Sequence, residues 1–200
     1  MAVSTPKKAK SSLRFEQQQE TRRKLVQAAF NVFSENGYRD ATIQDITREA
    51  GASRATFYIH FNNKAEVIAA AWQDLLIEKM IPHYRSLNAV DPCSEEALSL
   101  WFDRMLAHWE EDRNFAIASN QALSDDPALA EVWVSGVKEF FLASPDFTGK
   151  MRCGPERAKL RFLLLCSQLD RIVFHWLSRD TAFDRSELVK ELTVSWMNEF

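Results

Sequence analysis

The 200-residue sequence lacks several patterns on which enzymes and secreted proteins depend. Its three cysteines, Cys93, Cys153 and Cys166, form no CxxC pair, so we expect neither a disulfide framework nor a zinc site. Its five glycines include no Gly-rich phosphate loop, and no nucleophile elbow is present. The four histidines have no spacing that would assemble a metal site. These absences argue against an enzyme and predict no metal or cofactor.

Long apolar runs and alternating patterns are also absent. No run approaches the roughly 20 apolar residues that span a bilayer, and no apolar segment follows the basic N-terminus as in a secretory signal. No window alternates with period two, so we expect little or no sheet. Hydrophobic residues make up 46% and charged residues 26%, a globular balance. The sequence therefore predicts a soluble, cytoplasmic, all-α protein of about nine helices, without membrane contact.

The net charge of −3 conceals an asymmetry along the chain. Residues 1–64 contain 11 Lys and Arg against 6 Asp and Glu, which gives +5. The remaining residues contain 14 of the 25 basic and 22 of the 28 acidic side chains, which gives −8. A basic head on an acidic body is typical of a module that binds a polyanion, attached to a part that does not.

The segment from Thr42 to Lys64 carries the clearest pattern in the chain. Thr42 and Asp45 have the spacing of a capping box at the start of a short helix. Gly51 follows that helix and can adopt a positive φ, and Ser53 can cap a second helix. A short helix, a turn containing glycine and a polar, basic second helix predict a DNA-reading helix-turn-helix.

The second helix would present the DNA contacts. Arg54 lies at its start, where a guanidinium can bond O6 and N7 of guanine together. Tyr58 and His60 would reach flanking phosphates, and Thr42 and Lys64 lie at helix starts that can hold the DNA backbone. Thr42 serving only as a cap and Tyr58 being partly packed remain open. The predicted DNA-contacting set is Thr42, Arg54, Ala55, Thr56, Tyr58, His60 and Lys64.

This region resembles the signature of the TetR family of bacterial transcriptional regulators. The resemblance covers roughly residues 20–70, with mild departures at Thr47 and Ala52. It implies a small-molecule effector bound in a helical body, and a homodimer in which the last two helices pair as a four-helix bundle. The matching residues are Ala28-Ala29-Phe30, Phe33, Gly37-Tyr38, Ala50-Gly51-Ala52-Ser53, Thr56-Phe57-Tyr58, Phe61 and Lys64.

We expect three parts: a disordered basic arm over residues 1–16, a DNA-binding domain over 17–63 and a body over 64–200 that binds the effector and dimerises. The first helix would run over 18–36 and end at Gly37. A helix capped by Asn63 would end near Pro82, and further helices would begin at Ser94, near Phe115 and at Asp126-Pro127. A loop over 144–154 would precede helices over 155–178 and 184–199.

The predicted helix over 155–178 is apolar on two sides, so it needs two packing partners. One can be its own domain and the other a second copy of the chain, because a two-fold dimer reads the two halves of a palindrome. A central helix buried in a monomer remains the alternative. The predicted dimer interface is Phe162, Leu165, Leu169, Val173, Trp176, Leu192 and Trp196.

The body carries many large rings, which pack with gaps and favour an apolar pocket. We expect an apolar or amphipathic effector bound by Trp72, Trp101, Met105, His108, Trp109, Trp133, Phe140 and His175. Each ring and each histidine can instead be ordinary core or surface. The sequence therefore predicts a repressor that binds double-stranded operator DNA and is released by an effector. Alternatives are a regulator governed by a protein partner or by abundance, a helical enzyme, and a protein-interaction module.

Overall fold

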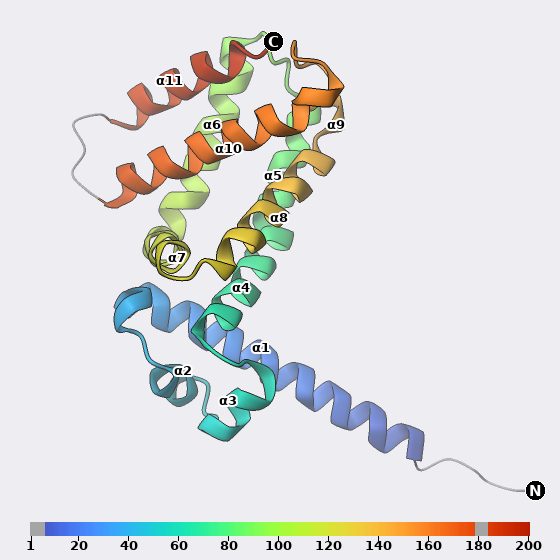
Figure 1. The fold of residues 1–200 in the computed structure, drawn as a ribbon, viewed down its shortest axis with the longest axis vertical. Helices are drawn as coiled ribbons and strands as arrows, with labels where there is room; N and C mark the ends of the chain where they lie inside the picture. The colour runs from blue at the N-terminus through green and yellow to red at the C-terminus, as the bar shows by residue number, and fades with distance from the viewer. Residues whose placement is uncertain (1–6, 179–183) are drawn as a thin grey trace, which may run out of the picture.

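The computed structural model describes residues 7–178 and 184–200, with side chains from residue 13 onward, and these residues form helices and no strand. The predicted all-α class is confirmed. Figure 1 shows a small head formed by the first three helices below a larger body, with α4 leading from one to the other. The helices of the head and its exit are α1 (Lys7–Asp40), α2 (Ile43–Glu49), α3 (Arg54–His60) and α4 (Lys64–Leu75). The body contains α5 (Ile81–Arg85), α6 (Glu95–Glu111), α7 (Arg113–Asp125), α8 (Ala128–Ala143), α9 (Pro145–Thr148), α10 (Pro155–Ser178) and α11 (Arg185–Met197).

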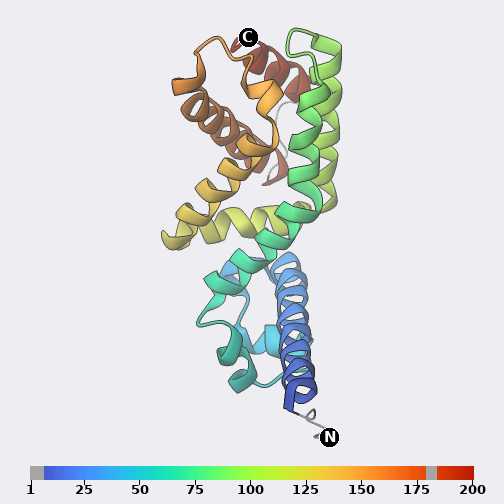
Figure 2. The ribbon, with the colours of Figure 1, turned by 90° about the vertical axis from the view of Figure 1, so that its right-hand side faces the viewer.

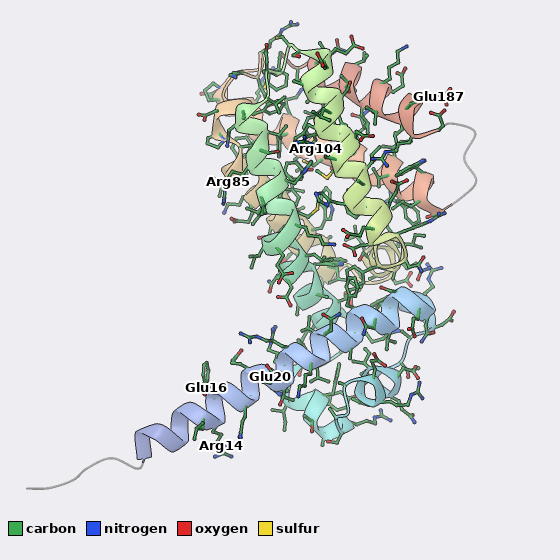
Figure 3. All side chains as sticks on the ribbon, turned by 180° about the vertical axis from the view of Figure 1, so that it is seen from behind. Arg14, Glu16, Glu20, Arg85, Arg104 and Glu187 are labelled. Carbon is green, nitrogen blue, oxygen red and sulfur yellow. The ribbon has the colours of Figure 1, made fainter. Side chains whose placement is uncertain are left out.

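Helix α1 begins earlier than the sequence predicted. It starts at Lys7, so the expected disordered arm is wrong for residues 7–16, and residues 1–6 lie outside the described part. The reason is that no glycine or proline interrupts residues 7–36, and Ala, Lys, Arg, Glu and Gln are good helix formers. The early turns of α1, which carry Arg14 and Glu16, extend beyond α2 and α3 (Figure 3).

The regular part of α1 ends at Gly37, as predicted. Gly37 has φ 74° and ψ 169°, and the last residues to Asp40 form a further turn beyond this kink. A side chain here would be strained by the positive φ, and its Cβ would also meet Oε1 of Gln121 at 3.1 Å. The glycine thus allows α7 to approach the end of α1 closely.

The helix after Asn63 does not end near Pro82. Asn63 caps α4 as predicted, but the chain continues through a π-helical turn over Leu76–Met80 into α5. Pro82 occupies the first turn of α5. Proline has no N–H to donate, and the wider turn accommodates this, with Ile81 N–H donating to the carbonyl of Leu76. Helix α4, the π-helical turn and α5 therefore form one continuous connection between head and body.

The body helices begin where the sequence predicted them. Ser94 caps α6, and Asp184 forms a capping box with Glu187 at the start of α11. At the start of α8, Oδ1 of Asp126 accepts the N–H of Ala128 at 3.1 Å. The expected loop over 144–154 contains the short helix α9. In the side view, α7 lies across the molecule directly above the head (Figure 2).

Two apolar clusters fill the described part of the chain. One lies in the body, around Trp101, Phe102, Phe162 and Trp196. The other fills the head and also contains Phe115, Ala118 and Ala122 of α7. Helix α7 therefore packs into the core of the head although it follows α6 in sequence. The predicted boundary at residues 63 and 64 stays a prediction, because α7 belongs to both parts by packing.

The residues predicted for a dimer interface face the protein's own core. Leu165, Leu169, Val173 and Leu192 are buried at 5% exposure or less. Phe162 and Trp196 are fully buried, and Trp176 packs partly against the same cluster. The structure packs six of the seven in the protein's own core and Trp176 partly against it, and their role at a dimer interface stays a prediction. The exposed apolar residues of α10 are Leu160 and Leu164, on its other side.

None of the described helices is long and apolar enough to cross a membrane. Within the same ranges, no group of His, Cys, Asp and Glu side chains is arranged to hold a metal ion.

Candidate DNA interface and effector cavity

The turn between α2 and α3 has the geometry that its sequence predicts. Thr42 and Asp45 form a complete capping box at the start of α2. Gly51 adopts φ 62°, which lets the N–H of Ala52 donate to the carbonyl of Thr47 at 2.9 Å. Ser53 then caps α3 by accepting the N–H of Thr56 at 3.0 Å. These bonds fix the angle at which α3 leaves the turn.

The inner face of α3 is held by aromatic packing. Phe57 is fully buried and Phe61 is 3% exposed, and their ring centroids lie 5.8 Å apart. Ile46 of α2 and Phe33 of α1 are fully buried in the same cluster. Since Phe57 and Phe61 fix the rotation of α3, the other side of this helix faces outward.

Three of the predicted DNA-contacting residues lie fully on the outward face. Arg54 and Ala55 at the start of α3 are exposed, and Tyr58 is 49% exposed. The Tyr58 ring packs edge-on against Phe57 at 5.6 Å, which orients the side chain while leaving its hydroxyl available. The structure thus brings a guanidinium, a methyl group and a phenol together on one short surface.

The hydroxyls of Thr42 and Thr56 are engaged in capping. Thr42 Oγ1 donates to Oδ2 of Asp45 at 2.6 Å. Thr56 Oγ1 shares a hydrogen bond of 2.8 Å with Ser53 Oγ, and its side chain is half-buried. Thr42 is exposed at the start of α2, where the free N–H groups of the helix can still face an anion.

His60 lies at the end of α3 and is half-buried. Burial lowers the pKa of its imidazole, and the nearby charge of Arg22 lowers this pKa further. A pKa below the ordinary value of 6.5 leaves the ring uncharged at neutral pH. His60 can therefore offer a hydrogen bond to DNA but no positive charge.

Lys64 points inward, toward the end of α1. Its Nζ donates to the carbonyls of Tyr38 at 2.7 Å and Ala41 at 2.8 Å, and it lies 4.7 Å from the centroid of the Tyr38 ring. Burial lowers the pKa of the ammonium. The ammonium satisfies carbonyls left open at the end of α1. Its predicted role as a phosphate contact is untested, and the geometry gives it this internal role.

A cavity of about 690 Å³ lies in the body, between α4, the π-helical turn, α5, α7, α8 and α10. Five of the eight predicted effector residues line it: Trp72, His108, Trp109, Trp133 and Phe140. Tyr84 adds a further ring, stacked on Phe140 with centroids 4.1 Å apart. A concave, aromatic-lined space of this size is typical of a small-molecule site.

The other three predicted effector residues lie elsewhere. Trp101 is 3% exposed and stacks near Trp196 at 5.5 Å, while Met105 is fully buried in the same core. His175 is exposed on α10, where its ring lies 5.5 Å from that of Phe174. The helical period placed these residues on an apolar or surface stripe but could not tell which stripe borders the cavity.

Asp170 is a lining residue that the sequence analysis did not place in the cavity. Burial raises the pKa of its carboxyl to about 6, while Arg171 and a hydrogen bond from Trp133 act in the opposite direction. At neutral pH the carboxylate is mostly ionised. A negative charge therefore lies in a cavity whose walls are largely aromatic.

Helix α7 connects the cavity to the head. Phe115, Ser119 and Leu123 line the cavity. The Phe115 ring lies 4.4 Å from that of Phe30 in α1, and Trp72 Nε1 donates to Ser119 Oγ at 2.8 Å. Helix α7 thus carries both cavity-lining side chains and part of the core of the head.

Two polar links join the far end of α7 to α1. Oε1 of Gln121 accepts the N–H of Tyr38 at 2.9 Å. The guanidinium of Arg39 donates to both carboxylate oxygens of Asp125 at 2.8 Å. A displacement of α7 would therefore also displace the residues that connect α1 to α2.

Comparisons with known proteins agree with this geometry. The sequence profile described as "Bacterial regulatory proteins, tetR family" matches residues 25–71, which span α2, α3 and the packed part of α1. The match shows that the head of this chain has the DNA-binding region of the TetR family. Proteins of this family are transcriptional regulators and not enzymes.

Individual relatives match this chain over different lengths. The regulator SrpR of Pseudomonas putida is 46% identical over 52 residues, which cover 26% of this chain and 24% of SrpR. The chain therefore matches only about a quarter of that relative. The fatty acid metabolism regulator protein of Bacillus subtilis is 23% identical over 184 residues, covering 86% of this chain and 92% of the relative.

A solved structure extends the likeness of fold to the body. The structure of FadR from Bacillus subtilis in complex with stearoyl-CoA superposes with a TM-score of 0.59 at 16% identity, covering 88% of this chain and 98% of the other. At this identity the likeness concerns the fold alone. The identity of the effector has to come from the cavity of this chain.

The TetR-family head contains an outward residue that the sequence analysis missed. Ile59 is 69% exposed on α3, next to Tyr58. An apolar residue on a short helix usually packs against the core, but Phe57 and Phe61 already occupy the inner face of α3. The four-residue spacing of these two rings was the signal that places Ile59 outward, where its side chain can contact a thymine methyl group.

Proposed function

We propose that this protein is a sequence-specific transcriptional repressor. It binds a palindromic operator as a homodimer and releases it when a small apolar or amphipathic effector fills the body cavity. The outward face of α3 carries this proposal, because Arg54, Tyr58 and Ile59 are exposed on a short helix whose other face is locked by Phe57. That combination is what major-groove reading requires.

The first test concerns Arg54. Arg54→Ala should weaken binding by about 1–3 kcal/mol and relax selectivity at one base pair of each half-site, because a bidentate contact to guanine is lost. Binding is measured by fluorescence anisotropy on DNA from upstream of the protein's own gene, with a set of single base-pair substitutions.

The matched control is Arg14→Ala, which removes a basic residue on the projecting turns of α1. It should weaken binding to all DNA sequences by the same factor and reduce the dependence of the affinity on salt concentration. An equal, sequence-independent loss for Arg54→Ala would overturn the assignment. Measuring at two salt concentrations separates the base contact from the electrostatic one.

Dimerisation is proposed through the outer side of the last two helices. Leu160 and Leu164 are 60% and 53% exposed on α10, and Val194 is 45% exposed on α11. Ser195 Oγ donates to Oε1 of Gln168 at 3.0 Å, which ties the two helices together on this side. Two such faces can pack as a four-helix bundle, and a two-fold dimer presents α3 twice to a palindrome.

The effector part of the proposal is supported by the cavity. A regulator controlled only by a protein partner or by its abundance would need no space of about 690 Å³ in its body. Because α7 lines the cavity and bonds to α1, filling the cavity can move the heads of the dimer relative to each other. FadR of Bacillus subtilis was solved with stearoyl-CoA, so an acyl-CoA thioester is included among the compounds to be tested.

Effector binding is tested by release of operator DNA. Anisotropy of labelled operator is followed while candidate compounds are added, with Gly136→Phe as the comparison. Gly136 lines the cavity, and a Cβ there would lie 3.4 Å from Leu76 Cδ1, so a large ring would fill the space. This variant should bind operator and stop responding to compounds. A wild-type response that persists in the variant would argue against the cavity.

A further inference from the structure

The charged side chains that line the body cavity are mostly acidic. Four carboxylates line it, namely Asp112, Glu131, Glu139 and Asp170, against a single ammonium, that of Lys79. Glu131 and Glu139 are exposed on α8, two turns apart, so they lie at the open side of the cavity. All of these side chains belong to the described part of the chain.

The one basic group is already neutralised. Lys79 Nζ lies 2.7 Å from Oδ2 of Asp112 and 2.9 Å from Oε2 of Glu111. An anionic ligand would have to compete with both carboxylates for this ammonium. Arg171, next to Asp170 in sequence, is exposed and lies over the ring of Phe174 at 5.6 Å, and it does not line the cavity.

Asp170 differs from the other acids by its surroundings. Its carboxylate is largely enclosed between α8 and α10, and Trp133 is its hydrogen-bonding neighbour. Arg171 is the cation that stabilises its charged form, and Tyr84 and Cys166 are the other titratable groups near it. Both of those groups are neutral at physiological pH because burial raises their pKa values. The ionised carboxylate has no lysine or arginine partner inside the cavity.

The rest of the wall is mostly apolar, and it includes several rings and one open acceptor. Trp72, Trp109, Trp133 and Tyr84 line the space, and their π faces attract a cation placed over them. Asn120 lines the same space at 7% exposure, and its Oδ1 accepts no hydrogen bond from any described residue. Carboxylates and ring faces complement a positively charged head group, and the amide oxygen can also accept a hydrogen bond from an amine.

We propose that the effector of this protein is an amphipathic organic cation, an amine or quaternary ammonium attached to an apolar body, whose charged head lies between Asp170 and the ring of Trp133. This inference rests on the proposed function and names the ligand class of its cavity. A polyphosphorylated head group such as that of coenzyme A would face four carboxylates instead. Burying a carboxylate that has no cation inside the cavity is unfavourable, and a cationic ligand compensates it on binding.

The test compares ligands of one chain length and different charge. Isothermal titration calorimetry at pH 7.5 measures binding of decyltrimethylammonium, decan-1-ol, decanoate and decanoyl-CoA, each below its critical micelle concentration. The cation should bind about tenfold or more tightly than either anion, since a desolvated cation over aromatic rings gains of that order. Equal or tighter binding of decanoate or decanoyl-CoA would overturn the proposal.

Variants then locate the head group. Asp170→Asn should weaken the cation about tenfold and change binding of the neutral alcohol by less than about twofold. Glu156→Gln, an exposed acid on the first turn of α10, is the matched control and should change neither. The double variant Glu131→Gln, Glu139→Gln alters exposed residues only and should weaken the cation by a smaller factor. Equal weakening of all four ligands by Asp170→Asn would contradict the assignment.

Operator release separates this inference from the proposed function. If the cation binds selectively in the calorimeter but no compound releases operator DNA, the assigned ligand class of the cavity holds and the effector part of the proposed function falls. If the alcohol and decanoate bind and release operator as well as the cation does, the proposed function holds and this inference falls.

Discussion

Two basic side chains near the helix-turn-helix differ in what surrounds their charge. Arg54 is exposed at the start of α3, whereas the Lys64 ammonium lies among the carbonyls of Tyr38, Arg39 and Ala41. A helix start is a reasonable place for a phosphate contact in either case. Only the position of the end of α1 shows that the Lys64 ammonium donates to its carbonyls and so stabilises the fold.

At the residue scale, Lys64→Met should destabilise the protein. The methionine retains most of the packing but leaves at least two carbonyls without a donor, which lowers the free energy of unfolding by about 1–3 kcal/mol. Urea unfolding followed by circular dichroism measures this change. Arg54→Met is the control and should change stability by less than about 0.5 kcal/mol. Equal stability of the two variants would show that the Lys64 bonds contribute nothing.

Asp170 gives a pH-dependent prediction. Its carboxyl has a pKa of about 6 in the folded protein against 3.8 as the ordinary value, so folding favours the protonated form. The wild type is therefore relatively more stable below about pH 4 and loses this contribution as the pH rises through 6. Asp170→Asn should exceed the wild type in free energy of unfolding by about 1–3 kcal/mol at pH 7.5.

The difference should become small near pH 4, where the carboxyl is protonated in the folded protein and partly protonated in the unfolded chain. Urea unfolding at pH 4, 6 and 7.5 measures it. A constant difference across this range would mean that the carboxylate is not destabilised by burial. A residue retained at a cost to stability is what a ligand-binding role leads one to expect.

At the scale of elements, α7 holds the position that links cavity and head. It lines the cavity through Phe115, Ser119 and Leu123, and it bonds to α1 through Gln121 and Asp125. Its apolar residues belong to the cluster of the head although the helix lies in the second half of the chain. Helical periodicity predicted that α7 exists but could not predict that it packs on α1.

Gln121→Ala should weaken the coupling between effector and DNA. The variant loses the acceptor for the Tyr38 N–H, so movement of α7 reaches α1 less directly. The ratio of operator affinities without and with effector should fall about threefold to tenfold, while effector affinity stays unchanged. Anisotropy and calorimetry measure the two quantities. Gln121→Glu, which keeps an acceptor at the same reach, should retain most of the coupling, and an identical loss in both variants would argue against this bond.

At the scale of the whole molecule, the proposed dimer would decide how many bases are read. The side of α10 that carries Leu165 and Val173 is closed by the protein's own helices, so only the side with Leu160 and Leu164 remains for a partner. The sequence predicted correctly that this helix is apolar on two sides. It placed the partner on the side that the structure buries, because both stripes have the same period.

Leu160→Glu combined with Leu164→Glu should convert the dimer to a monomer. Four carboxylates would face one another across a two-fold interface, which is strongly unfavourable. Analytical ultracentrifugation measures the mass, and operator affinity should fall because a monomer holds one half-site only. Leu142→Glu, on the exposed side of α8 at 58%, is the control and should stay dimeric. A dimer that survives the double variant would place the interface elsewhere.

Local sequence determined the helix-turn-helix and most helix boundaries. Thr42, Gly51, Ser53, Asn63 and Asp184 act within a few residues of themselves through capping bonds and one positive φ, so neighbouring residues suffice to predict them. The outward position of Arg54 follows in the same way from the spacing of Phe57 and Phe61. The same local rules extended α1 to Lys7, since no residue there stops a helix.

Tertiary structure alone decided what depends on residues distant in sequence. Lys64 is surrounded by the end of α1. Only the folded body shows that Asp170 lies in the cavity, whereas Trp101 and Met105 lie in the core. The covered and the open side of α10 have the same apolar period, and they differ only in what packs against them. Periodicity specifies that a face is buried, whereas the identity of its partner depends on how all the helices pack together.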